Sequence, residues 1–125
     1  MSFDWSEYLN VAKELAGITT TPANQEAKLR AAISRAYYAA FIKARNYLRD
    51  QEGHSIPKTS DAHKYVRNQF ELSSDPIRKT VAEKLARLRE FRGQADYVDR
   101  FPGLLGITLT ALILSEEVIS TLNSL

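Results

Sequence analysis

The chain has 125 residues, no cysteine and a formal net charge of +2. This length predicts one domain over residues 1–125 with a single buried core, and the absence of cysteine excludes disulfides and thiolate metal sites. Asp4 and Glu7 lie where a signal peptide would be basic, and the longest apolar run, Phe101–Leu114, is shorter than the roughly 20 residues of a spanning helix. We therefore expect a soluble, cytoplasmic protein without a membrane span.

Two helices are predicted in the first half of the chain. Asp4, with Glu7 three residues later, is typical of an N-cap, and apolar residues at helical spacing continue up to Gly17. The second helix is expected to begin with Pro22 at its first position and to end before Gly53.

Three further helices are predicted in the second half. Thr59 or Ser60 caps a short third helix, and Asp75–Pro76 repeats the cap-then-proline pattern at the start of a fourth. The last helix is expected over Leu104–Leu122, although the β-branched residues of Ile107–Leu114 also fit a strand. Because no other segment resembles a strand, we predict an all-α, up-and-down bundle of four to five helices.

The second helix is expected to organise the fold. Between Ala27 and Arg49 it contains six basic residues and no acid. This cationic side is either a phosphate-binding surface or a solvated face whose charge is balanced by acidic residues elsewhere in the chain. A narrow strip of Ala31, Tyr38 and Ile42 interrupts it and suggests contact with another subunit. The opposite, core-facing side has apolar residues at helical spacing: Leu29, Ile33, Ala36, Tyr37, Ala40, Phe41, Ala44, Tyr47 and Leu48.

Arg92 is the most unusual residue of the fourth helix, because it falls on the same arc as the apolar residues of that helix. A buried guanidinium needs an anion or several acceptors, and Asp96 at i+4 and Asp99 at i+7 are placed to answer it. The arrangement is either a structural ion pair or part of an exposed functional site. Gly93 directly afterwards indicates a close approach by another backbone or a ligand.

Two adjacent tyrosines of the second helix point to different sides. Tyr37 is expected in the core, with its hydroxyl reaching a partner. Tyr38 shares its side with Arg45 and Arg49. Aromatic and guanidinium groups side by side stack on and charge-pair with single-stranded RNA, but they also form ordinary subunit interfaces.

The two histidines, His54 and His63, are not at a metal-ligand spacing, and no cluster of His, Asp and Glu is visible. There is no glycine-rich phosphate loop and no local signature of a Ser-His-Asp triad. We therefore predict no metal site and no cofactor.

Three segments together carry a family resemblance: Ser34–Leu48, His63–Phe70 and Leu88–Tyr97. Their order and spacing, and the break before a final apolar helix, resemble a small stand-alone HEPN domain protein over nearly the whole chain. The resemblance implies a helical bundle that dimerises, with a polar cleft near the two-fold axis. Many HEPN proteins are metal-independent ribonucleases, and several are toxins paired with a small nucleotidyltransferase antitoxin.

The HEPN catalytic motif is an Arg followed, after four to six residues, by a His. Arg92 matches the Arg, but no His follows at that spacing, and Tyr97 occupies the first of the positions. The resemblance implies catalytic candidates Arg92, Asp96 and Tyr97, with His63 as a substitute base, and Tyr97 as the candidate for modification by the partner enzyme. The candidate RNA- or nucleotide-binding residues are Arg35, Tyr38, Arg45 and Arg49. The alternative is an inactive HEPN module that binds RNA, nucleotide or a partner protein.

Overall fold

The computed structural model describes residues 2–19 and 21–125, and these contain five α-helices and no strand. The helices are α1 (Glu7–Leu15), α2 (Gln25–Glu52), α3 (Asp61–Glu71), α4 (Pro76–Tyr97) and α5 (Leu104–Ser124). The prediction of an all-α helical bundle is confirmed, and residues 107–114 are helical.

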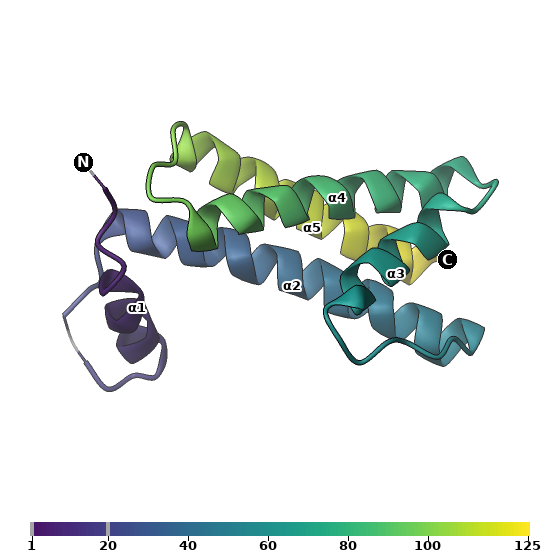
Figure 1. Ribbon diagram of the computed structural model, residues 1–125, viewed down its shortest axis with the longest axis horizontal. Coiled ribbons are helices and arrows are strands. Elements are labelled where there is room, and N and C mark those ends of the chain that lie inside the picture. Colours follow the sequence, from purple (N-terminus) through teal and green to yellow (C-terminus); the bar gives the residue numbers. More distant parts are fainter. Residues whose placement is uncertain (1, 20) are drawn as a thin grey trace.

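Helix α2 is the central element, because it contacts each of the other four helices. It has 28 residues, which corresponds to about 42 Å at 1.5 Å per residue. Helix α4 runs back along it, α5 returns beside both, α3 crosses its far end, and α1 projects from its near end (Figure 1). The buried residues of α2 recur at helical spacing: Ala27, Arg30, Ile33, Ala36, Tyr37, Ala40, Phe41, Ala44 and Leu48.

The ends of α2 and α4 follow from their caps. Asp75 accepts a hydrogen bond from the Ile77 amide at 2.9 Å and Pro76 occupies the first turn of α4, as predicted. Helix α2, however, begins three residues after Pro22. The carboxamide of Asn24 accepts from the Ala27 amide at 2.8 Å while the Asn24 backbone is extended. This cap satisfies a free amide of the first turn, so the helix begins directly after Asn24 and not at Pro22.

Helix α1 also begins later than predicted. The Asp4 carboxylate accepts from the Ser6 amide at 3.0 Å and from the Ser6 hydroxyl at 2.7 Å, so Asp4 closes a turn before the helix. Gly17 and Gly53 lie beyond the ends of α1 and α2 with φ of +73° and +72°. Glycine adopts this left-handed conformation without steric penalty, as the sequence pattern required.

The apolar residues form two clusters. The main core joins α2, α3, α4 and α5. A smaller cluster joins the N-terminal residues to the start of α2, and consists of Phe3, Val11, Ala23 and Ala27, with Trp5, Tyr8 and Ala31 packed against it. We call residues Phe3–Leu15 the N-terminal arm. Its apolar contacts are separate from the main core, and hydrogen bonds from Trp5 and Tyr8 also join it to residues 95–99.

The apolar run Phe101–Leu114 was predicted to be too short to span a membrane, but helix α5 continues beyond it to Ser124. Its 21 residues are long and apolar enough to cross a membrane by length and composition, a test that the core helix of a soluble protein also passes. One face packs into the core, where the hydroxyl of Ser115 donates to the carbonyl of Ala36 at 2.7 Å. The other face exposes Leu105, Leu109, Leu112 and Ile113.

Candidate functional site

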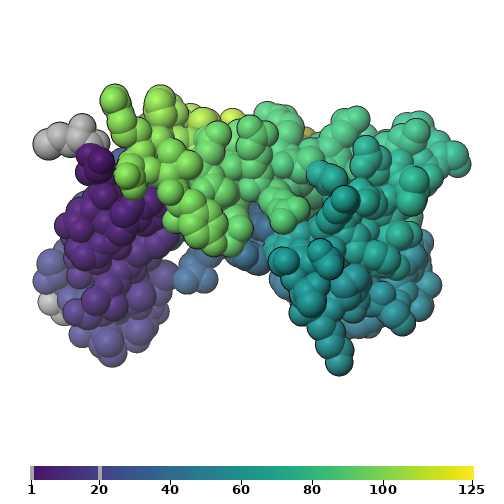
Figure 2. All heavy atoms as spheres, in the orientation of Figure 1, coloured from purple at the N-terminus to yellow at the C-terminus, as the bar shows by residue number. Residues whose placement is uncertain are grey.

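A cleft lies along α2, between α1 and α3. Figure 2 shows this face hollowed between the N-terminal arm and the α3 region, with α4 above it. The cleft consists of two adjoining hollows, of about 880 and 750 Å³, which share Tyr38 and Ile42. Ala31, Tyr38 and Ile42, the strip that was expected to meet another subunit, line the first hollow. The strip is therefore left without a covering helix in the single chain.

Arg92 lies next to the first hollow: it lines neither hollow itself, but it contacts Tyr38 and Asp96, which line the first. Its side chain is 20% exposed, and its Nε is 3.0 Å from Asp96 Oδ2, so the predicted i+4 ion pair is present. The guanidinium carbon lies 5.2 Å from the centre of the Tyr38 ring and 5.3 Å from that of Tyr97. Nη2 is 3.4 Å from the Tyr97 hydroxyl. Asp96 thus occupies the Nε side of the guanidinium, and two tyrosine rings lie beside it.

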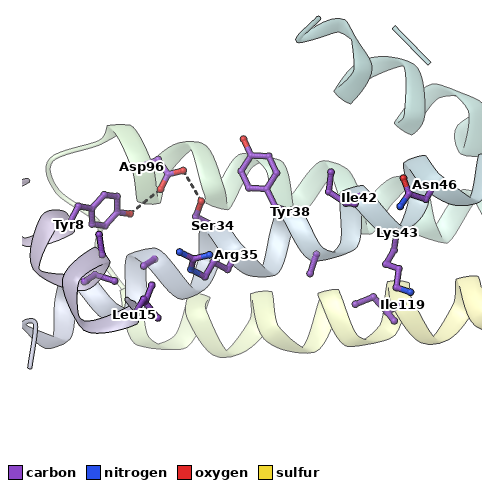
Figure 3. A pocket seen from close by; sticks show the side chains of 14 residues that line it. Tyr8, Leu15, Ser34, Arg35, Tyr38, Ile42, Lys43, Asn46, Asp96 and Ile119 are labelled. Atoms are coloured by element: carbon purple, nitrogen blue, oxygen red, sulfur yellow. Dashed lines mark hydrogen bonds between the residues drawn. The ribbon is translucent and has the colours of Figure 1, made fainter. Parts of the chain in front are cut away.

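The Asp96 carboxylate is itself held by two hydroxyl groups. Tyr8 donates to Oδ1 at 2.9 Å and Ser34 donates to Oδ2 at 3.0 Å (Figure 3). The pKa of Tyr8 is raised, mainly by burial and also by the nearby Asp96 charge, so its hydroxyl remains a donor at physiological pH. The sequence did not identify Tyr8 or Ser34 as site residues, because the arm and α4 are almost ninety positions apart.

Asp99 does not form an ion pair with Arg92, contrary to the prediction. Its carboxylate accepts from the Trp5 indole Nε1 at 2.8 Å. Helix α4 ends at Tyr97 and Val98 is extended, so the i+7 relation of a continuing helix no longer applies at position 99. Gly93 is also not explained by a close approach within the chain, because a Cβ placed there would meet no atom within 4 Å.

Arg30 is fully buried, and its position in the sequence was not recognised as part of the site. Its guanidinium donates to the backbone carbonyls of Ala95 at 3.0 Å, Val98 at 2.6 Å and Asp99 at 2.9 Å. The nearest carboxylate oxygen, of Glu26, is 3.9 Å away. Carbonyls at the C-terminal end of α4 carry the negative end of the helix dipole. They therefore offset the cost of burying this cation.

His63 lies in the second hollow, next to Tyr37 and stacked on Phe41 at 4.3 Å between ring centres. Its Nδ1 is hydrogen-bonded to the Tyr37 hydroxyl, which was predicted to reach a partner. Burial raises the pKa of Tyr37 to about 12. The pKa of His63 is lowered, first by burial and then by the charges of Arg89 and Arg92. A neutral ring whose Nδ1 accepts the Tyr37 proton carries its own proton on Nε2.

The remaining cationic candidates lie on both sides of Tyr38. Arg35 is exposed and lines the first hollow, while Arg45 and Arg49 line the second. Arg45 donates to the Asn46 carboxamide oxygen at 3.0 Å, and Arg49 donates to the Asp50 carboxylate at 2.7 Å. The expected arrangement of Tyr38 with these arginines along one side of α2 is thus present. Among residues 2–19 and 21–125, no group of three His, Asp or Glu is placed to hold a metal.

Comparison with known families identifies the bundle. The model of the HEPN domain matches residues 23–125, which include all of α2 to α5. The chain belongs to the HEPN domain family. The HEPN match contains Arg92, Asp96 and Tyr97, whereas the N-terminal arm lies before it.

The uncharacterized protein MJ0992 of Methanocaldococcus jannaschii is 31% identical over 109 residues, which cover 76% of this HEPN chain. The alignment spans 60% of the length of that relative. No solved structure gives a significant match.

Proposed function

We propose that this HEPN protein is an RNA-directed component of toxin–antitoxin type, with a metal-independent, ribonuclease-like site around Arg92. The observation that carries the proposal is the Arg92 guanidinium next to the first hollow, paired with Asp96 on its Nε side and flanked by the rings of Tyr38 and Tyr97. Asp96 on the Nε side and the Tyr97 hydroxyl on Nη2 leave Nη1 and one proton of Nη2 for a phosphate, which a guanidinium binds through two parallel hydrogen bonds. Tyr38 offers a face for stacking a base.

In metal-independent RNA cleavage, the 2′-oxygen attacks the adjacent phosphorus and the bond to the 5′-oxygen breaks. A base removes the 2′ proton, an acid protonates the leaving oxygen, and a cation offsets the charge of the phosphorane. Arg92 supplies the cation in this proposal. A homodimer, which the HEPN family favours, would bring a second Arg92 and Tyr97 to the same RNA.

The proposal extends to location and partners. We infer one domain over residues 1–125, a cytoplasmic location and a nucleotidyltransferase antitoxin as the protein partner. Tyr97 is 70% exposed, so its hydroxyl is accessible to an enzyme that would modify it. Such a modification would add a negative charge next to Arg92 and would weaken phosphate binding.

A specific observation favours a second candidate, a HEPN module that binds RNA, nucleotide or a partner protein without cleaving it. No His follows Arg92 at the motif spacing, and the substitute His63 uses Nδ1 to contact Tyr37. If Tyr37 is the donor, the other ring nitrogen is protonated and is a donor, not a base. Cleavage by His63 would require the opposite tautomer.

The two candidates are separated by incubating the purified protein with total RNA and a chelator. The toxin-type proposal predicts cleavage in the presence of the chelator that falls at least 100-fold in Arg92→Ala, while Arg87→Ala, an exposed arginine of the same helix, cleaves like wild type. RNA binding without cleavage in all three proteins would support the second candidate. Neither binding nor cleavage of RNA would refute the toxin-type proposal and the RNA-binding form of the second candidate.

A further inference from the structure

The N-terminal arm contacts the C-terminal end of α4, which carries the Arg92 site. The Phe3 amide donates to the Asp99 carbonyl at 3.3 Å, and the Trp5 indole donates to the Asp99 carboxylate at 2.8 Å. Tyr8 donates to Asp96 at 2.9 Å and lies 3.1 Å from the carbonyl of Ala95. The arm therefore contacts two residues near the end of α4, Ala95 and Asp96, and one residue of the turn that follows, Asp99.

Arg30 of α2 contacts both the arm and the same end of α4. Its guanidinium carbon lies 4.4 Å from the centre of the Phe3 ring and 5.0 Å from that of Trp5. The same guanidinium donates to the carbonyls of Ala95, Val98 and Asp99. Cation–π contacts of a desolvated guanidinium are worth more than exposed ones, so the arm and the α4 end are both held by one buried group.

We infer that the N-terminal arm, which precedes the family-matched residues, is a positioning element of the Arg92 site, and that Tyr8 is its key positioning residue. Tyr8 and Ser34 hold the two oxygens of Asp96, and Asp96 Oδ2 lies 3.0 Å from the buried Nε of Arg92, which pairs with it by charge and makes no hydrogen bond. The terminal nitrogens of Arg92 are then held in one orientation at the cleft. The role of this orientation in RNA binding depends on the proposed function, whereas the orientation itself does not.

The test uses the full chain with Tyr8→Phe, which removes only the hydroxyl and keeps the ring in its cluster. The matched control is Tyr65→Phe, which also removes a hydrogen-bonded tyrosine hydroxyl, here one bonded to His54 at 2.7 Å. Loss of one hydrogen bond to a charged group is expected to weaken the affinity for a single-stranded oligoribonucleotide about 3- to 10-fold. The slope of affinity against salt should not change, because Tyr8 does not bind phosphate.

A double-mutant cycle separates positioning from a general structural effect. Tyr8→Phe should weaken RNA binding in the wild-type background but have no effect in Arg92→Ala. Equal effects in both backgrounds, unchanged affinity in Tyr8→Phe, or tighter binding in Tyr8→Phe would each overturn the inference. Trp5 is the single tryptophan of the chain. Its unchanged emission in Tyr8→Phe would show that the arm remains docked.

A second measurement does not need RNA. The side-chain Nε–H signal of Arg92, assigned by its loss in Arg92→Ala, should exchange with water faster in Tyr8→Phe than in wild type and Tyr65→Phe. This result together with no RNA binding by wild type would refute the proposed function and leave the positioning role standing. Identical exchange in wild type and Tyr8→Phe would refute the positioning role whatever the RNA result.

Discussion

At the scale of single residues, two arginines have different roles that their positions in the sequence only partly indicate. The inward arc of α4 identified Arg92, because an arginine among apolar residues stands out. Arg30 occupies the core stripe of α2 in the same way, three residues before the buried Ile33. It was counted only among the basic residues of α2, although Glu26, four residues before it, has the spacing of an ion-pair partner. Its partners are backbone carbonyls of a turn, which leave no side-chain signal in the sequence.

His63 gives a prediction about pH. Its pKa in the folded protein is lowered from 6.5, first by burial and then by Arg89 and Arg92. Below pH 6.5 the unfolded chain therefore binds more protons at this residue than the folded chain does. His63 should therefore lower the unfolding free energy as the pH falls from 6.5 toward its pKa in the folded protein. Well above pH 6.5 it should not change the pH dependence of stability.

Urea denaturation at pH 5.0 and 7.5 tests this sign. The loss of unfolding free energy between the two values should be smaller in His63→Gln than in wild type. An NMR titration of the His63 ring should give a midpoint below 6.5. An equal loss in both proteins, or a midpoint above 6.5, would contradict the assignment of His63 as a neutral residue of the cleft.

At the scale of the helices, the sequence predicted the five elements because each has a periodic apolar face and a recognisable stop. Boundaries failed where a side-chain contact decided them, as at Asn24. The prediction that Asp99 pairs with Arg92 was wrong because it assumed that the helix continues to position 99, whereas α4 ends at Tyr97. The contacts of Asp96 with Tyr8 and Ser34 could not be predicted from the sequence, since they depend on how α1 and α2 pack against α4.

The buried contacts of Arg30 predict that the C-terminal end of α4 depends on this residue. Arg30→Met keeps much of the side-chain volume but leaves three backbone carbonyls without their donor. We expect a loss of about 2–3 kcal/mol of unfolding free energy, since unsatisfied buried acceptors cost about 1–3 kcal/mol each and water reaches part of this turn. Arg35→Met, at an exposed position of the same helix, should change stability by less than about 0.5 kcal/mol. Equal stability of wild type and Arg30→Met in urea would contradict this account.

At the scale of the whole molecule, the cleft follows from the way α1 and α3 stand apart on α2 (Figure 1). The long α2 extends past the small N-terminal cluster and past α3, so the strip containing Tyr38 stays open between them. The sequence indicated this strip by its position between cationic residues. It did not indicate that α4 would bring Arg92 against the Tyr38 ring. The proposed homodimer and RNA site both use this uncovered surface.

The central claim is that Arg92 binds an RNA phosphate at this cleft. The most direct test is the salt dependence of the affinity for a single-stranded oligoribonucleotide, compared between wild type, Arg92→Ala and Arg87→Ala. A lost phosphate contact reduces the slope of log affinity against log salt by about 0.7 for single strands. We predict this reduction, with weaker binding, in Arg92→Ala and the wild-type slope in Arg87→Ala. The same slope and affinity in all three proteins would contradict the claim.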